Sequence, residues 1–319
     1  MPDSLDIATV IPTFNRSRLV RRAIESAFAQ TVRPNQVIIV DDGSTDDTEA
    51  VCREYGNTIE YVRQRNQGVA AARNHGIRLV RHSWTAFLDS DDYWAPTHLE
   101  KISDAIKETS GEARFYFTDM ALPQSARYRT LWEKIRFQFS RPFLLKENAT
   151  GWMLSQRQPV ALPCSVFRTD ILRISGGFDV RYRTMEDTEL FCRTGIAGPV
   201  CAVNTVGGYE TDDDLESNRL TRIVHSRSEG CWENECRLWA GLLERFPDLT
   251  PDYQRGLNYS LAVAHWRLSR LQWRSLRPAR SARNLFRSAH AQPAFLLWLL
   301  RHGKSWGWEG SVFPQCRAT

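Results

Sequence analysis

The sequence of 319 residues lacks a long hydrophobic run, and it lacks the cysteine spacing of a zinc site or a disulfide framework. Its longest apolar stretch, residues 294–300, is far shorter than the roughly 20 residues that a membrane-spanning helix needs. The start of the chain carries no basic residue, so we expect no secretory signal. The seven cysteines are scattered without a CxxC spacing, which predicts reduced thiols and a cytoplasmic protein.

Acidic residues are missing from one part of the chain. Between Tyr253 and Trp308 there is no Asp or Glu, whereas this stretch holds ten Arg and Lys. Because Glu309 and Arg317 cancel, the net charge of +5 leaves −5 on residues 1–252. The composition changes near residues 247–251, after a helical pattern that begins at 229. We therefore predict one domain over residues 1–228 and a basic, helical region over residues 229–319.

The first third of the chain alternates short apolar runs with helical patterns. Strands are predicted at residues 7–11, 37–40, 59–62, 85–88 and 115–118, and helices at 18–30, 46–55 and 69–80. Pro12 is predicted to stop the first strand, and Thr45 to cap the second helix. Short strands that are apolar throughout indicate a parallel sheet covered on both faces, and right-handed crossovers make it doubly wound.

The later part of the chain is less regular. A turn is predicted at residues 176–179 and a short helix at 186–194. Residues 121–160 show no clear period and are interpreted as an insertion around the site. The acidic run 210–216 is interpreted as a solvated loop rather than a lid. Further helices are predicted at residues 229–245, 254–274, 279–290 and 293–302.

Carboxylates gather where the predicted parallel strands end. Asp41 and Asp42 follow the second strand, and Asp89, Asp91 and Asp92 follow the fourth. Ligands of doubly wound sheets bind at this edge, outside the carboxyl ends of the strands. The mutual repulsion of five carboxylates is costly unless a cation or sugar hydroxyls compensate it. The pattern therefore favours a binding site at this edge.

Six motifs follow one another in a fixed order over about residues 7–195. They are VIPTFNR at 10–16, VDDGSTD at 40–46, NQGVAAARN at 66–74, FLDSDD at 87–92, GGFD at 176–179 and ED at 186–187. This set resembles the family 2 inverting glycosyltransferases of the GT-A fold. The resemblance implies an α/β fold with a doubly wound, Rossmann-like, mostly parallel sheet, followed here by the α-helical C-terminal region. It also implies that a sugar moves from a nucleotide diphosphate donor, expected to be a UDP-sugar, to an acceptor hydroxyl with inversion.

The resemblance assigns a divalent cation to the carboxylates after the fourth strand. Asp91 matches the metal-binding member of the family's D-x-D motif, and Asp89 matches the residue on the donor ribose or in the metal shell. Asp92 is a third candidate. His225, in an Arg-x-x-His stretch, is expected at the metal or the diphosphate, with a purely structural histidine as the alternative. Few protein ligands suit Mg²⁺ or Mn²⁺, which keep waters and bind substrate phosphates.

The same resemblance assigns the donor pocket. Arg73 is expected on the diphosphate, although an exposed helix arginine is an alternative interpretation. Asp41 and Asp42 match residues that reach the base and ribose. The turn after the first strand is expected to line the same pocket, through Pro12, Thr13 and Asn15.

Attack by an acceptor hydroxyl requires a general base on the face opposite the leaving group. By resemblance this base is Asp187. The alternative is that the acidic residues of this segment only cap the helix that begins there, a role that Glu186 or Glu189 also fits.

The acceptor is expected to be a saccharide or a lipid-linked molecule, read by residues 121–160 and 155–170, in cell-surface polysaccharide, glycolipid or glycoconjugate assembly. The basic helices carry two interpretations. They attach to an anionic membrane surface on its inner, cytoplasmic face, or they pack on the acidic domain through their Trp and Leu faces. Packing is the favoured interpretation, because Trp266, Leu268 and Leu271 fit core positions.

Two other classes of protein remain as alternatives. A nucleotidyltransferase also uses a doubly wound sheet and metal carboxylates, but it usually has a Gly-rich loop after the first strand. A non-catalytic nucleotide- or nucleic-acid-binding protein leaves the carboxylates unexplained, so we expect no nucleic-acid partner.

Overall fold

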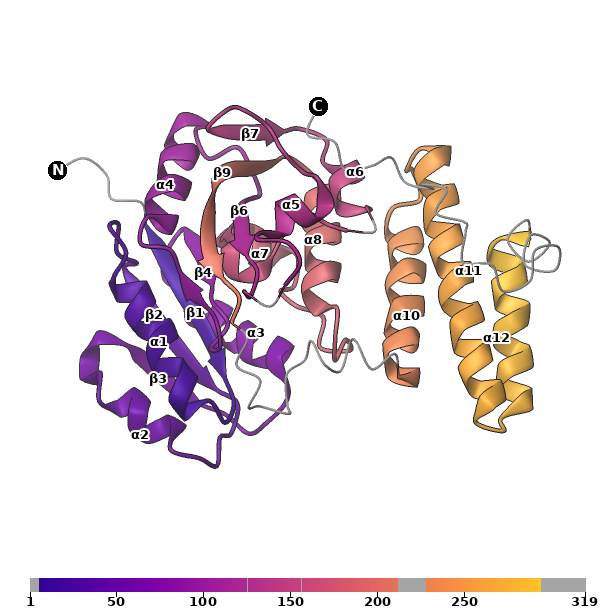
Figure 1. The fold of residues 1–319 in the computed structure, drawn as a ribbon, viewed down its shortest axis with the longest axis horizontal. Helices are drawn as coiled ribbons and strands as arrows, with labels where there is room; N and C mark the ends of the chain where they lie inside the picture. Colours follow the sequence, from indigo (N-terminus) through magenta and orange to yellow (C-terminus); the bar gives the residue numbers. More distant parts are fainter. Residues whose placement is uncertain (1–5, 125, 156, 212–227, 294–319) are drawn as a thin grey trace. The chain divides into compact units, whose positions relative to one another are not determined.

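A computed structural model describes residues 6–124, 126–155, 157–211 and 228–293 (Figure 1). Within these ranges the chain forms two compact units, an α/β unit whose described part ends at Thr211 and a unit of three helices that begins at Glu229. The division predicted after residue 228 stays a prediction, because residues 212–227 lie outside the described ranges. Among the described helices, none combines the length and the hydropathy that a bilayer span requires.

One mixed sheet runs through the α/β unit. Its strands follow the order β3-β2-β1-β4-β8-β6-β9-β5, and β7 pairs with β9. The strand bounds are β1 (Ile7–Thr13), β2 (Gln36–Asp41), β3 (Glu60–Arg63), β4 (Trp84–Phe87), β5 (Tyr93–Trp94), β6 (Phe115–Ala121), β7 (Phe143–Lys146), β8 (Ser165–Arg168) and β9 (Val200–Tyr209).

The sheet is parallel where its strands come from the first part of the chain, in which the sequence predicted most strands. β1 pairs in parallel with both β2 and β4, and β2 pairs in parallel with β3. Beyond β4 the direction changes, because β8 is antiparallel to both β4 and β6, whereas β6 and β9 are parallel. This architecture confirms the predicted α/β class.

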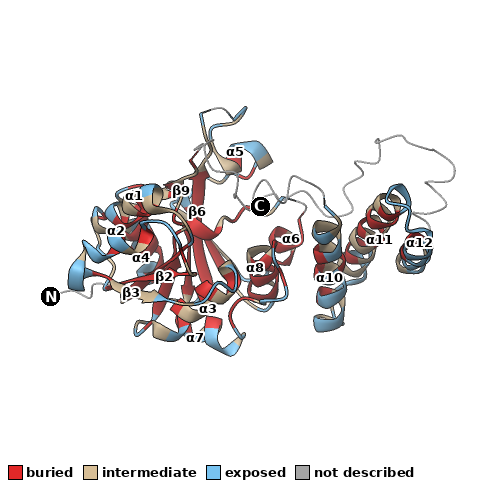
Figure 2. Ribbon diagram, turned by 90° about the horizontal axis from the view of Figure 1, so that it is seen from below, coloured by how far each residue is buried: buried red, intermediate tan, exposed pale blue. Residues whose placement is uncertain are grey.

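Helices cover both faces of the sheet, and the buried strands lie between helices whose outer sides are exposed (Figure 2). On one face Ile11 and Ile39 join a core cluster with residues of α1 and α4, and on the other Val10 lies against Gly76 of α3. The helix bounds are α1 (Ser17–Phe28), α2 (Thr48–Arg53), α3 (Val69–Leu79), α4 (His98–Glu108), α5 (Leu131–Ile135), α6 (Thr150–Met153), α7 (Thr169–Ile174) and α8 (Glu186–Ile196). Two short 3₁₀ helices are η1 (Gly56–Thr58) and η2 (Leu162–Cys164).

Pro12 does not stop the first strand, contrary to the prediction. β1 continues to Thr13, and Pro12 lies in register with Val40 of β2. Along a strand, alternate residues bond to the same side, and the carbonyl of Val10 accepts from the nitrogen of Leu88 at 3.1 Å. Pro12 therefore faces the side on which β4 has already ended, where a missing N–H leaves no partner unsatisfied.

Thr45 is not the cap of the second helix, which is another correction. α2 begins at Thr48, and Oδ1 of Asp46 accepts from the backbone nitrogen of Thr48 at 3.1 Å. The backbone nitrogen of Thr45 instead donates to Oδ1 of Asn15 at 2.8 Å, which ties the turn after β2 to the turn after β1. The carboxylate of Asp46, and not the hydroxyl of Thr45, thus accepts from the backbone at the start of α2.

Residues 121–160, which show no sequence period, fold around an aromatic cluster. Phe117 of β6 has its ring centroid within 6.3 Å of those of Trp132, Phe137 and Trp152. This segment supplies α5, β7 and α6. Its order comes from ring packing rather than from a regular hydrophobic repeat.

The basic end contains α10 (Glu229–Arg245), α11 (Pro251–Arg274) and α12 (Pro278–Ala291), close to the predicted helices. Pro251 and Pro278 occupy first turns, where the missing N–H costs nothing. The small core of this unit includes Cys236, Ala264 and Leu268. The helix predicted at 293–302 lies almost wholly outside the described residues.

Candidate active site

The carboxyl ends of β1, β2 and β4 meet at one edge of the sheet, because these strands are parallel neighbours. Asp41 is the last residue of β2, and Asp89 lies two residues beyond the end of β4. The structure therefore brings the predicted strand-end carboxylates to one edge.

Arg73 of α3 connects two motifs that are far apart in the sequence. Its Nη2 lies 2.7 Å from Oδ1 of Asp89, and its Nη1 lies 2.7 Å from Oε1 of Glu186. The arginine is 3% exposed, and its guanidinium lies 5.3 Å from the ring centroid of Phe178. We call this pair of contacts the Arg73 bridge. It brings the segment after β4 and the start of α8 to a single side chain.

The alternative interpretation of Arg73 as an exposed helix arginine is wrong, because the side chain is buried. Burial lowers the pKa of the guanidinium, but the charges of Asp89 and Glu186 outweigh this effect and raise it, so Arg73 stays charged. Contact of Arg73 with a diphosphate stays a prediction, since both terminal nitrogens already bond carboxylates.

Carboxylate charge is concentrated around the bridge. Burial, reinforced by the charge of Asp187, raises the pKa of Glu186 to about 7, and Arg73 opposes this rise. Burial also raises the pKa of Asp92 well above its usual range, and the charges of Asp91 and Asp89 add to the effect. A cation placed among these groups would lower the repulsion.

Asp91 is held by its backbone as well as its side chain. Its carbonyl oxygen accepts from Nη2 of Arg22 at 2.8 Å and from the hydroxyl of Thr211, which follows β9. Oδ2 of Asp91 lies 3.8 Å from Nη2 of Arg16. These contacts fix the position of the segment after β4 from two directions.

The oxygen donors of this segment fit a divalent cation that takes few protein ligands. The side chains of Asp89 and Asp91 are 29% and 22% exposed, so their carboxylates are accessible. The described residues contain no cluster of three His, Cys, Asp or Glu arranged as a ligand set. A cation here would complete its shell with water and substrate phosphate, as Mg²⁺ and Mn²⁺ do. His225, the third predicted ligand, lies outside the described residues.

Asp41 and Asp42 each organise a neighbouring loop. The two oxygens of Asp41 accept from the hydroxyl of Tyr61 and the nitrogen of Ser44, both at 2.7 Å. Oδ2 of Asp42 accepts from the nitrogen of Gly68 at 2.7 Å, just before α3. Both residues are buried. Their predicted contacts with a base and ribose remain predictions, and the observed bonds already give both residues a structural role.

The turn after β1 packs against the turn after β2. Asn15 has a positive φ of 52°, and its backbone nitrogen donates to Oγ of Ser44 at 2.8 Å. Pro12 and Thr13 end β1 and are buried. The Oγ1 of Thr13 is buried without a hydrogen-bond partner among the described residues.

Asp187 lies in the first turn of α8, beside Glu186, and is partly exposed. Its Oδ1 accepts from the backbone nitrogen of Thr188 at 2.6 Å. The candidate base Asp187 therefore follows Glu186, which Arg73 holds, in the first turn of α8.

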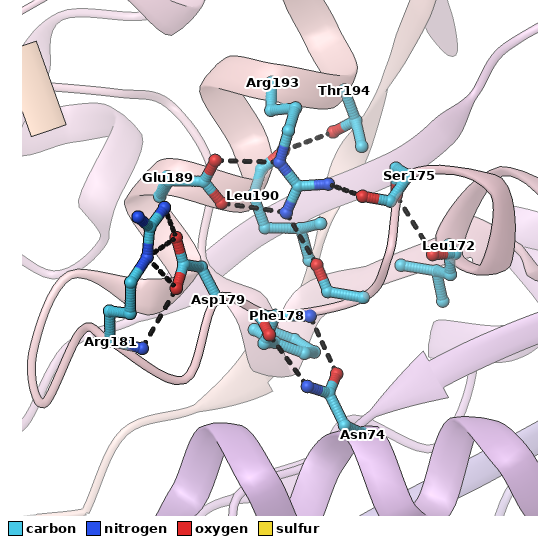
Figure 3. Close-up of polar contacts among 11 residues, drawn as sticks. Asn74, Leu172, Ser175, Phe178, Asp179, Arg181, Glu189, Leu190, Arg193 and Thr194 are labelled. Carbon is cyan, nitrogen blue, oxygen red and sulfur yellow. Dashed lines mark hydrogen bonds and ion pairs between the residues drawn. The ribbon is translucent and has the colours of Figure 1, made fainter. Parts of the chain in front are cut away.

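A network that the sequence analysis missed holds this helix start in place (Figure 3). Oδ1 of Asn74 accepts from the nitrogen of Phe178 and its Nδ2 donates to the carbonyl of Phe178, both at 2.7 Å. Arg193 of α8 pairs with Glu189 at 2.8 Å and donates to the carbonyl of Gly177 at 2.6 Å. The i,i+4 spacing of Glu189 and Arg193 signalled their pairing, but nothing in the sequence signalled the carbonyl partner.

Comparison with known proteins agrees with this fold. The model of the family "Glycosyl transferase family 2" matches residues 9–157. The chain is 27% identical over 208 residues to a chondroitin synthase of Escherichia coli, covering 63% of this chain and 28% of that protein. It is 31% identical over 218 residues to an uncharacterized glycosyltransferase of Rickettsia conorii, covering 67% of this chain and 33% of that protein. The chain thus spans about a third or less of the length of these relatives.

Solved structures share the fold at low sequence identity. Residues 1–349 of Staphylococcus aureus TarS, in complex with UDP-GlcNAc, match with a TM-score of 0.55, 16% identity and 92% coverage of both chains. The mannosyltransferase PcManGT of Pyrobaculum calidifontis, in complex with GDP-Man and Mn²⁺, matches with a TM-score of 0.53 and 16% identity, over 94% of this chain and 81% of that one.

The fold is therefore the GT-A type, as the sequence predicted. The chain contains a domain of glycosyl transferase family 2, a family of transferase enzymes.

Proposed function

We propose that this chain is a metal-dependent, inverting glycosyltransferase that moves a sugar from a nucleotide diphosphate donor to an acceptor hydroxyl. The Arg73 bridge is the observation that supports the proposal best. It joins Asp89, one of the proposed cation ligands, to Glu186, the neighbour of the proposed base. Sugar transfer needs these two kinds of carboxylate close together, because one serves the donor and the other serves the acceptor.

Asp187 is the proposed general base. As the acceptor oxygen attacks the anomeric carbon, its proton passes to the Asp187 carboxylate. The bond from the anomeric carbon to the diphosphate oxygen breaks on the opposite face, which inverts the configuration. Partial exposure leaves Asp187 accessible to an acceptor, and the bond from Thr188 orients its carboxylate.

Asp91 and Asp89 are the proposed cation ligands, with His225 as a predicted third. A bound Mg²⁺ or Mn²⁺ would neutralise the negative charge that grows on the departing diphosphate. Burial raises the pKa of Asp92, the charges of Asp91 and Asp89 add to this rise, and this concentration of acidic groups supports a cation at this place.

The donor pocket is proposed at the joined turns after β1 and β2. The bond from the backbone nitrogen of Asn15 to Ser44 and the bond from the backbone nitrogen of Thr45 to Asn15 hold these two turns together. Its proposed lining is Pro12, Thr13, Asn15, Asp41, Asp42 and Arg73.

The proposed donor is a UDP-sugar, which the complex of TarS with UDP-GlcNAc supports only by fold. The proposed acceptor is a saccharide or lipid-linked molecule in cell-surface polysaccharide, glycolipid or glycoconjugate assembly, at the cytoplasmic side. The similarity to a chondroitin synthase supports a saccharide acceptor.

A donor screen tests the proposal. Purified protein is incubated with a panel of UDP-, GDP- and other nucleotide-sugars in Mn²⁺ or Mg²⁺, and free nucleoside diphosphate is measured before and after EDTA. We expect release from one donor class, its loss with EDTA and its recovery with added cation.

Two variants sharpen the donor screen. Asp91→Asn should lose the cation-dependent release, whereas Asp47→Asn, at an exposed position before α2, should keep it. Release that is unchanged by EDTA contradicts the metal assignment. Pyrophosphate release from nucleoside triphosphates, with no release from any nucleotide-sugar, identifies a nucleotidyltransferase instead.

A further inference from the structure

The last described helix, α12, buries a polar face. Ser288 donates to the carbonyl of Ala262 at 2.8 Å, and Nδ2 of Asn284 donates to Oε1 of Gln272 at 2.9 Å. Oγ of Ser269 donates to the carbonyl of Ser281 at 2.9 Å, one turn earlier. Small polar side chains therefore hold α12 against α11, and its apolar side chains are not needed for this contact.

Large apolar side chains are exposed on α12, on the turn before it and at the end of α11. With about 100° between successive helical residues, Phe286 lies on the side of α12 opposite Ser281, Asn284 and Ser288. Exposure is 73% for Phe286, 42% for Leu285, 90% for Leu276 and 67% for Trp273. A water-facing helix does not need such residues, so their exposure indicates a surface that binds something.

Arginines border these apolar side chains. The exposed arginines of this stretch are Arg274, Arg277, Arg280, Arg283 and Arg287. Among the described residues, Arg277 pairs with Glu229 at 2.9 Å, and the stretch from Tyr253 to Trp308 has no acidic residue of its own. The border therefore carries concentrated positive charge.

We infer that these residues bind the surface of a bilayer that contains anionic lipid. We call them the aromatic–arginine surface: Trp273, Leu276, Leu285 and Phe286 with Arg274, Arg280, Arg283 and Arg287. Aromatic and leucine side chains enter the boundary between headgroups and acyl chains, while arginines contact the lipid phosphates. A nucleic acid would use the arginines but has no place for exposed Leu276 and Leu285. This inference goes beyond the proposed function and is independent of it.

Vesicle sedimentation with the full chain tests the inference. The probes are vesicles of phosphatidylcholine alone and of phosphatidylcholine mixed with phosphatidylglycerol. We expect the protein to sediment only with the mixed vesicles, and high salt to weaken this binding because it screens the arginines.

Three variants separate charge from insertion. Arg283→Gln/Arg287→Gln should lower the partition coefficient by about fivefold for each arginine. Arg245→Gln/Arg255→Gln removes the same charge from exposed positions of α10 and α11 and should have little effect. Phe286→Ser should lower partitioning by roughly tenfold, because it removes an inserting ring.

Four results would overturn the inference. They are no sedimentation with mixed vesicles, an equal loss in the Arg245/Arg255 control, full binding by Phe286→Ser, and a dimer in solution that Phe286→Ser converts to monomer. Unchanged melting temperatures verify that the variants fold, since all the substituted side chains are exposed. Nucleotide release from a soluble donor is measured in parallel and should not change, so failure here is distinct from failure of the proposed function.

Discussion

Replacing Arg73 should damage both stability and transfer, because one guanidinium holds two carboxylates. In Arg73→Gln, Glu186 and Asp89 lose their charged partner at 2.7 Å. Removing one partner of a buried ion pair typically costs about 3–5 kcal/mol. The partial exposure of Asp89, and the ability of Glu186 to take a proton, favour the lower value, about 3 kcal/mol in unfolding free energy.

The pH dependence of this loss gives a second signature. Burial raises the pKa of Glu186 from its ordinary value of 4.5 to about 7 in the folded protein, so its contribution to stability is complete below about pH 4.5 and is lost as the pH rises from there through about 7. Without Arg73 the folded-state pKa rises further, so the folded variant binds more protons than the wild type. The destabilisation by Arg73→Gln should therefore grow as the pH rises through about 7.

The assay is urea unfolding over a pH series, together with donor turnover. Arg73→Lys should lose less stability than Arg73→Gln because it keeps the positive charge, but it should not match the wild type because an ammonium cannot bond two carboxylates as a guanidinium does. Arg78→Gln, at an exposed position of the same helix, is the matched control and should shift unfolding by less than about 0.5 kcal/mol. If Arg73→Gln unfolds and turns over like Arg78→Gln, the Arg73 bridge has no structural or catalytic importance.

Three smaller predictions follow from the packing. Gly76→Ala should destabilise by about 1 kcal/mol, since its Cβ would lie 2.3 Å from a methyl of Val10, and Gly230→Ala, with open space around it, should not. Burial lowers the pKa of His98 to about 3, so the folded protein resists protonation of this histidine. The free energy of unfolding should therefore fall by about 2 kcal/mol as the pH falls from 7 to 5, and His98→Asn should flatten this pH dependence in thermal melts. Asn74→Asp should slow turnover relative to the control Gly230→Ala, because a carboxylate cannot donate to the carbonyl of Phe178, and Asn74→Gln, which keeps the amide, should slow it less. A fully active Asn74→Asp would refute that positioning role.

The parallel half of the sheet was predictable because each strand is apolar along its whole length. The helix from Val69 was predicted to within one residue at each end, and it presents Arg73 to the site. Parallel neighbouring strands end at the same edge of a sheet, so the placement of Asp41 and Asp89 at one edge could be predicted from the sheet alone, whereas their role in binding a ligand stays a prediction.

The antiparallel strands were not predicted. β8 is antiparallel to β4 and β9 is antiparallel to β5, and in both pairs the partners lie far apart in the sequence, so no local pattern encodes the pairing. Arg73 and Glu186 meet across 113 positions for the same reason. A motif indicated that each mattered, but only the folded chain shows that they contact each other.

The central claim is that Asp187 takes the proton of the acceptor while other residues bind the donor. The most direct measurement is a comparison of donor dissociation constant and turnover in Asp187→Asn, with Asp170→Asn, a surface carboxylate paired with Arg168, as the control. We expect turnover to fall by about 100-fold or more, as the loss of a general base requires, while the donor dissociation constant stays close to that of the wild type. A donor affinity that falls in proportion to turnover, or a turnover equal to that of the control, would contradict it.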